Sequence, residues 1–179
     1  GAAGHHEQGG ATLGQRRRAE AEAAADVIGA EYVTFDNPEG ELEPSVDKRQ
    51  EVIELIRAVE PDLIFTHRPN DYHPDHRYTA QLVKDAAYMV TVPNICPQTP
   101  HLTYNPVICY LPDRFDKPYP LDADIAVDID DTWDTKLDML HQYESQMYEW
   151  LPYNVGMLDQ VPDDEAERRA WLPTRYGER

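Results

Sequence analysis

A short apolar run from Asp62 to His67 (DLIFTH) constrains the fold of this 179-residue chain more than any other feature. An apolar run without polar alternation is typical of a strand covered on both faces, as in parallel sheets. Ser45 can cap a helix before this strand, Pro61 closes that helix, and Pro74 suits the first turn of a helix after it. A strand between two helices predicts an α/β layered fold with a largely parallel sheet.

The remaining segments continue this alternation after a glycine-rich opening loop, residues 1–14. From their apolar spacing we expect further helices over residues 15–28, 74–88, 131–150 and 163–172. From their β-rich composition we expect further strands over residues 31–35, 106–111 and 124–129. In sheets of this kind ligands bind beyond the carboxyl ends of the strands, so a site is expected directly after His67.

The charge balance argues against one class of partner. The chain has 34 acidic and 16 basic residues, a formal charge of −18, and its only basic cluster is Arg16–Arg18. Binding to phosphate polyanions depends on clustered Lys and Arg, so we expect no nucleic-acid partner and a small-molecule substrate instead. No apolar run approaches the about 20 residues that a membrane helix needs, so we expect no membrane span.

Other features bound the protein only loosely. Cys96 and Cys109 form no CxxC motif, which favours reduced thiols in a cytoplasmic protein. The chain begins at Gly1 rather than Met, so its sequence does not show whether a signal peptide precedes it. A homo-oligomer is compatible with the sequence. The Pro-rich segment 92–106 and the aromatic stretch YEWLPY near Trp150 either line the mouth of the substrate site or bury an interface.

Chemistry is concentrated in the segment Asn70–Arg77 (NDYHPDHR), which follows the buried strand. With Pro74 in the first helical turn, His73 lies at the cap and His76 one turn on, so both imidazoles can point to the same side. Asp75 lies between them and can accept a proton from a ring N–H. A catalytic zinc centre needs three protein ligands and a water, so further ligands must come from elsewhere.

Several segments together resemble the PIG-L/LmbE family of zinc-dependent deacetylases, which remove acetyl from N-acetylglucosaminyl groups. The segment 61–76 (PDLIFTHRPNDYHPDH) is similar to the second motif of the family, and 17–30 (RRAEAEAAADVIGA) is similar to its Arg-x-x-Glu helix. The segment 37–42 (NPEGEL) is similar to its Asp-Gly turn, with Glu39 in place of Asp. The segment 136–146 (KLDMLHQYESQ) is similar to its late helix, although Tyr143 stands where His is common. The resemblance implies a Rossmann-like three-layer α/β/α fold with a mostly parallel sheet.

The resemblance also implies roles for single residues. His76 corresponds to the third Zn²⁺ ligand, His73 to the imidazole that steadies the tetrahedral oxyanion, and Asp75 to its orienting partner. Arg17 and Glu39 match positions of substrate contacts, for which surface salt bridges are the alternative. His5 and His6 resemble a loop beside the site, with a solvated loop as the alternative.

One departure from the family pattern is large. The first motif, His-Pro-Asp-Asp-Glu, supplies two zinc ligands and the general base, and nothing before Gln15 provides it. Residues 161–165 (VPDDE) imitate it with Val in place of His, and we interpret them as an acidic helix cap. We therefore expect one domain over residues 1–179 that lacks its first strand and first metal motif. An inactive fragment or a sugar-binding pseudoenzyme is the alternative, and the gene upstream of Gly1 would distinguish them.

A more distant alternative is a hydrolase of the metallo-β-lactamase type. Residues 71–76 differ by one residue from its His-x-His-x-Asp-His signature. That fold needs further His ligands downstream, and His101 lies in a Pro-rich loop while His141 lies in an amphipathic helix. We therefore favour a zinc-dependent N-deacetylase, for an amino-sugar conjugate whose identity the sequence does not define.

Overall fold

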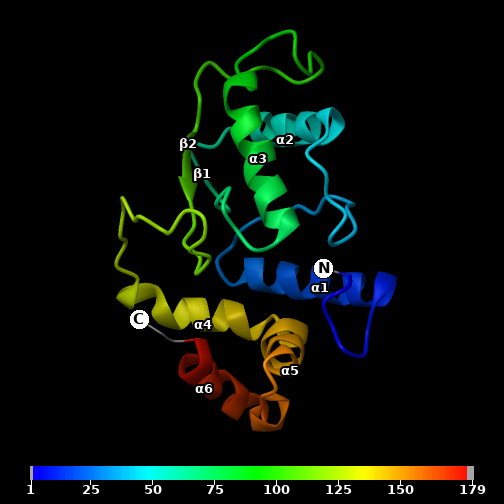
Figure 1. The fold of residues 1–179 in the computed structure, drawn as a ribbon, viewed down its shortest axis with the longest axis vertical. Helices are drawn as coiled ribbons and strands as arrows, with labels where there is room; N and C mark the ends of the chain where they lie inside the picture. Colours follow the sequence, from blue (N-terminus) through cyan, green and yellow to red (C-terminus); the bar gives the residue numbers. More distant parts are fainter. Residues whose placement is uncertain (1, 177–179) are drawn as a thin grey trace. The chain divides into compact units, whose positions relative to one another are not determined.

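The structure is a computed structural model that describes residues 2–176, and its contacts divide these into two compact units. One unit runs from Gly40 to Ala126, and the other combines the residues up to Glu39 with those from Val127 onward. The helices and strands, in chain order, are α1 (Gly10–Asp26), α2 (Val46–Val59), β1 (Leu63–Thr66), α3 (Pro74–Met89), β2 (Val107–Tyr110), α4 (Trp133–His141), α5 (Leu151–Asn154) and α6 (Glu165–Tyr176) (Figure 1). The prediction of one domain over the whole chain stays a prediction.

The 40–126 unit contains the predicted strand and the helices that flank it. β1 and β2 pair in parallel, with Leu63 opposite Val107 and Thr66 opposite Tyr110. α3 is the crossover between them and packs on α2, as Figure 1 shows in green and cyan. The sequence therefore predicted the β1–α3–β2 unit correctly, because a parallel pair of strands requires such a crossover.

α2 begins and ends where its local sequence predicts. Ser45 has extended backbone, and its hydroxyl accepts a hydrogen bond from the Lys48 N–H at 3.3 Å, which satisfies one free donor of the first turn. Glu60 ends the helix in the left-handed conformation, with φ of 52°. Pro61 explains this ending, since a residue before proline is disfavoured in the right-handed helical region.

A buried arginine organises the connection that follows α3. Arg57 is 2% exposed, and all three of its guanidinium nitrogens donate to main-chain carbonyl groups. The acceptors are Met89, Val90, Val92, Ile95, Cys96 and Thr99, at 2.7–3.1 Å. Four of these carbonyl groups also accept a main-chain N–H, whereas those of Ile95 and Thr99 rely on the guanidinium, so Arg57 completes the hydrogen bonds of a connection with little regular structure.

The other unit is helical. Leu137, Tyr148 and Leu172 form its buried cluster, and α4 packs on both α1 and α6. α1 begins at Gly10, inside the segment predicted as loop, because Leu13 is fully buried and anchors its first turns. α6 covers residues 165–176 rather than 163–172.

The long helix predicted over residues 131–150 is wrong in one respect, because it is interrupted. α4 ends at His141, and residues Ser145–Trp150 form a π-helix that continues into α5. At the interruption the Ser145 N–H donates to Glu20 Oε1 at 3.0 Å, and the Ser145 hydroxyl donates to Glu20 Oε2 at 2.6 Å. Because the Ser145 N–H donates to Glu20, it makes no α-helical hydrogen bond to the main chain. Such an interruption of the main-chain hydrogen bonds is where π-helical turns occur.

Two predicted strands are also wrong, so the sheet is smaller than expected. Residues 31–35 and 124–129 have no strand structure, and Val33, Ile125 and Val127 are more than half exposed. A strand needs a neighbour for its N–H and C=O groups, and these segments pair with nothing among residues 2–176. The described chain is mostly helical with a two-stranded parallel sheet, in place of the broad parallel sheet of the expected three-layer fold. None of the helices in the described part is both long and apolar enough to cross a membrane.

Candidate active site

The residues of the predicted motif lie in the loop after β1 and in the first turn of α3, at the carboxyl end of the strand. His73 is the N-cap of α3, with φ −93° and ψ 132°, and Pro74 occupies the first turn. The His73 Nδ1 atom accepts a hydrogen bond from the Asp75 N–H at 3.2 Å. The imidazole thus caps the helix, and the positive end of the helix dipole points at the site.

His76 is held by a carboxylate that the sequence did not assign to it. Its Nδ1 atom lies 3.0 Å from Asp71 Oδ1, and the same oxygen accepts the His73 N–H at 2.9 Å. Asp71 is 3% exposed. Burial alone would raise the pKa of Asp71, but the His73 N–H and the His76 ring outweigh it, so this pKa lies below its usual value.

The two imidazoles carry their protons on opposite nitrogens. An ionised carboxylate only accepts hydrogen bonds, so His76 carries its proton on Nδ1 and keeps a lone pair on Nε2. His73 accepts at Nδ1, so its neutral ring carries the proton on Nε2. Neither Nε2 atom has a hydrogen-bond partner among the described residues. His76 therefore offers an electron pair, and His73 offers an N–H.

A third imidazole completes a group that could hold a metal ion. His67 stacks on His76, with ring centroids 4.0 Å apart and planes 3° apart, and the His73 ring lies 4.8 Å from that of His76. Single ligand atoms of His67, Asp71 and His76 all lie within 4.8 Å of one another. Burial, and next the nearby His76, lower the pKa of His67, so its ring stays neutral, as a metal ligand must be.

This donor set fits Zn²⁺. Imidazole nitrogen and carboxylate oxygen are zinc ligands, and catalytic sites use three of them. The group supports the expected metal site, and it does not identify the metal.

The sequence missed His67 and gave Asp71 no role. His67 was counted only as the last residue of the strand, and Asp71 only as one member of an acidic and histidine-rich cluster. The available signal was position, because both residues follow the carboxyl end of β1, where ligand sites of parallel sheets lie.

Asp75 has a different contact from the one expected. Its Oδ2 atom accepts the Gly40 N–H at 2.7 Å, and Gly40 has a φ of 83° in the turn before α2. The contact that orients a ring comes from Asp71 instead. A catalytic role for Asp75 stays a prediction.

Arg17 and Glu39 lie together in the other compact unit. Arg17 is 9% exposed and donates to Ser145 Oγ at 3.3 Å, to the Gly4 carbonyl and to the Gln146 side chain. Glu39 accepts the N–H groups of Ala3 and Gly4 at 2.9 and 3.2 Å. Burial would raise the pKa of Glu39, but these two N–H groups outweigh it and lower this pKa. Substrate binding by Arg17 and Glu39 stays a prediction.

His5 and His6 belong to the same unit as Arg17 and lie in a stacked set of rings. His5 stacks on His6, and His6 stacks on Tyr153 with centroids 4.2 Å apart. The His5 Nε2 atom also lies 2.6 Å from a Glu149 carboxylate oxygen. These contacts show an ordered loop in place of the solvated one, and they do not relate it to the metal group.

The loop after β2 is tied to the loop after β1. Arg68 is 7% exposed and donates to Asp113 Oδ1 at 2.9 Å and to the Tyr119 carbonyl at 2.7 Å. Asn70 Nδ2 donates to the carbonyl groups of Phe115 and Tyr119. Because Arg68 and Asn70 lie between His67 and Asp71, the loop formed by residues 113–119 borders the metal-capable group.

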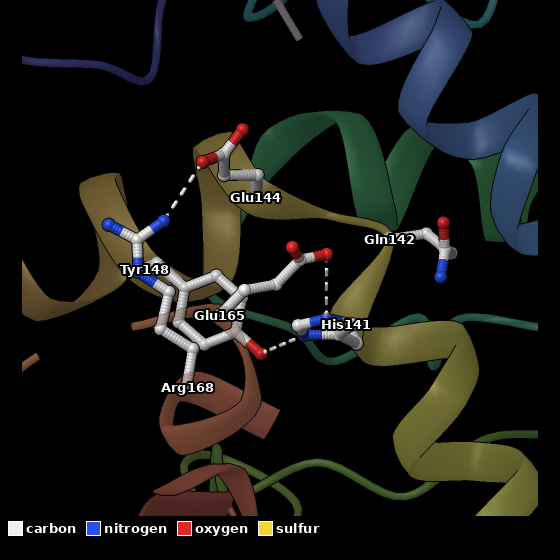
Figure 2. A pocket seen from close by; sticks show the side chains of 6 residues that line it. All are labelled: His141, Gln142, Glu144, Tyr148, Glu165 and Arg168. Carbon is white, nitrogen blue, oxygen red and sulfur yellow. Dashed lines mark hydrogen bonds and ion pairs between the residues drawn. The ribbon is translucent and has the colours of Figure 1, made fainter. Parts of the chain in front are cut away.

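His101, His141 and residues 161–165 lie outside the metal-capable group. Figure 2 shows a pocket of about 390 Å³ whose lining residues are His141, Gln142, Glu144, Tyr148, Glu165 and Arg168. In it the His141 Nδ1 atom lies 2.7 Å from the Tyr148 hydroxyl oxygen. Asp164 accepts the N–H groups of Ala166 and Glu167, which confirms that residues 161–165 provide an acidic helix cap. His101 is exposed and His141 has these other contacts, so neither belongs to the metal-capable group.

Comparisons with known proteins identify the family and the fold of the chain. The profile of the family described as "PIG-L: GlcNAc-PI de-N-acetylase" matches residues 1–87, and the chain belongs to the PIG-L/LmbE family. A curated relative, 4-oxalmesaconate hydratase of Pseudomonas putida, is 25% identical over 138 residues. This alignment covers 76% of the chain and 53% of the relative, so the chain spans about half the length of that relative.

Solved structures share the fold. N,N'-diacetylchitobiose deacetylase from Pyrococcus horikoshii matches with a TM-score of 0.71 and 23% identity, over 90% of this chain and 62% of that one. GalB, the 4-carboxy-2-hydroxymuconate hydratase of Pseudomonas putida KT2440, matches with a TM-score of 0.70 and 21% identity, over 97% and 70%. The chain thus has an LmbE-like fold, and the similar proteins include both deacetylases and hydratases.

Proposed function

We propose that the protein is a zinc-dependent hydrolase that removes the acetyl group from an N-acetylglucosaminyl-type conjugate. The observation that carries this proposal is the pair of Nδ1 contacts at the start of α3, of His76 with the Asp71 carboxylate and of His73 with the Asp75 N–H, from which opposite tautomers follow. One ring supplies a lone pair for a metal, and the other supplies an N–H for a developing negative charge. Amide hydrolysis needs both functions at one carbonyl group.

His76 Nε2 and His67 would hold the metal beside the buried Asp71 carboxylate. When bound, Zn²⁺ supplies Lewis-acid polarisation of the acetyl carbonyl and makes water a stronger nucleophile near neutral pH. The His73 Nε2–H donates to the carbonyl oxygen as charge develops on it. Water adds to the acetyl carbon and loses a proton, the C–N bond breaks, and the nitrogen takes up a proton, so the products are acetate and a free amine.

The charges around the site favour an uncharged acetamido group as substrate. A substrate with several carboxylates would need cationic side chains that are free to bind it. Arg68 already pairs with Asp113, and the Arg77 Nη1 atom donates to the carbonyl groups of Asp71 and Tyr72. The formal charge of −18 also disfavours a multiply charged anion.

A hydratase is the second candidate, since the 25% identical relative and GalB are both named as hydratases. Addition of water to a carbon–carbon double bond could use the same metal-capable group. The two candidates differ in their products, because a hydratase releases neither acetate nor an amine.

The deciding experiment uses the full-length protein loaded with zinc. It is incubated with N,N'-diacetylchitobiose and N-acetylglucosamine conjugates, and acetate and primary amine are measured. We expect equal amounts of both products, and removal of zinc with a chelator should abolish them. His76→Ala should lose zinc and activity together, whereas His101→Ala, at an exposed ring, should keep both. Hydration of 4-oxalmesaconate without acetate release from any conjugate would refute the deacetylase in favour of the hydratase.

A further inference from the structure

We propose, on the basis of the role proposed above for His76, that Asp71 is the positioning residue of the site. Its carboxylate selects the Nδ1–H tautomer of His76, and it fixes the main chain that carries His73. One buried side chain would then prepare the electron-pair donor and the N–H donor together.

The contacts of one oxygen atom support this role. Asp71 Oδ1 lies 3.0 Å from His76 Nδ1 and 2.9 Å from the His73 nitrogen, and both distances are those of hydrogen bonds. The main chain beside Asp71 is also held, because Arg77 Nη1 donates to the Asp71 carbonyl at 2.8 Å. Asp71 therefore has little freedom to turn away from His76.

Asp75, the nearest alternative, does not fill this role. Its Oδ2 atom accepts the Gly40 N–H, and its Oδ1 atom has no hydrogen-bond partner among the described residues. Helix geometry explains the difference, because neighbouring positions of a helix point about 100° apart. The Asp75 side chain therefore points in a different direction from that of His76, while Asp71 contacts His76 from the preceding loop.

A direct bond from Asp71 to the metal is the competing role, since its ligand atom belongs to the metal-capable group. The two roles make different predictions for the protein without metal. A positioning carboxylate determines the His76 tautomer before any metal binds. A carboxylate that acts only as a ligand leaves that tautomer unchanged when it is replaced.

The test is the tautomer of His76 in the metal-free protein, read from the imidazole ¹⁵N chemical shifts and their couplings to the ring protons. We expect Nδ1–H in the unmodified protein. Asp71→Ala removes the oxygen that accepts from His76 Nδ1, so we expect a shift toward Nε2–H. The same oxygen accepts the His73 N–H, so the amide spectrum of α3 is recorded to show whether the fold is retained. Asp75→Ala is the matched control and should keep the Nδ1–H tautomer.

Zinc affinity, measured by competition with a chromophoric chelator, is the second measurement. Loss of a carboxylate that orients a metal-binding His costs about 10–100-fold in affinity, and we expect a loss of this size in Asp71→Ala. An unchanged His76 tautomer in Asp71→Ala would overturn the inference, whatever happens to the affinity. If the unmodified protein binds zinc but releases no acetate, the deacetylase proposal fails and the positioning role stands.

Discussion

The buried Arg57 and the half-buried His73–His76 pair are polar groups of the same 40–126 unit, and they differ in how completely their hydrogen bonds are used. All three Arg57 nitrogens donate to carbonyl groups of the connection after α3. Each imidazole uses its Nδ1 atom and leaves Nε2 without a partner among residues 2–176. A saturated group can stabilise the fold but has nothing left to offer a ligand, whereas a half-used group can bind one. The degree of saturation therefore separates structural from functional polar residues in this unit.

The largest effect is expected at the saturated group. Arg57→Met keeps much of the side-chain volume but removes six hydrogen bonds. The carbonyl groups of Met89, Val90, Val92 and Cys96 keep a main-chain donor, whereas those of Ile95 and Thr99 lose the donor that Arg57 supplies. Each buried unsatisfied group costs about 1–3 kcal/mol, so for these two groups we expect the free energy of unfolding to fall by about 2–6 kcal/mol. Urea denaturation measures this change. Arg49→Met, at a side chain with one weak ion pair at 4.0 Å, is the control and should change stability little. A loss below about 1 kcal/mol in Arg57→Met would contradict the comparison.

At the half-used group the effect should appear in rate rather than in stability. His73→Asn keeps a side chain that can cap α3, since Asn is among the favoured capping residues. It removes the Nε2–H, and we expect kcat to fall by about 10²–10³ with the zinc content unchanged, as for removal of one oxyanion donor. The measurement is acetate release under saturating substrate, with metal analysis of the same sample. Loss of zinc in this variant would instead make His73 a ligand.

A substitution of Arg17 tests whether this predicted substrate contact is a structural or a functional polar residue. Its contacts with Gly4, Ser145 and Gln146 are all internal to its unit. By analogy with Arg57 we expect Arg17→Met to lower the free energy of unfolding by about 2–3 kcal/mol, because buried acceptors lose their partner. Thermal unfolding and KM are measured on the same variant. A higher KM with unchanged stability would give Arg17 the substrate role that the family resemblance implies.

The smallest effect is expected at a helix cap outside both groups. Ser45→Ala removes the hydroxyl that accepts the Lys48 N–H, and such caps contribute about 1 kcal/mol. We expect a loss of this size in stability and no change in kcat or zinc content. Ser45→Asp, which restores a capping oxygen, should recover the stability. An effect on kcat would mean that α2 is coupled to the site more closely than its contacts indicate.

Much of the site-bearing unit could be predicted because its signals are local. Ser45, Pro61 and Pro74 mark the ends of α2 and the start of α3 through contacts within a few residues. The placement of His73 and His76 on one side of the helix start follows from the same geometry. The predicted strands over residues 31–35 and 124–129 failed because a strand depends on distant neighbours, which a β-rich composition does not guarantee.

By itself, the sequence determined the β1–α3–β2 unit, the histidine pair at its carboxyl end and membership of the PIG-L/LmbE family. Only the tertiary structure decided that Asp71 rather than Asp75 holds His76, that His67 stacks beside it, and that Glu20 interrupts the helix at Ser145. The physical reason is the range of the interactions. Caps and turns are set by adjacent residues, whereas the partner of a side chain depends on where the folded chain brings its atoms in space.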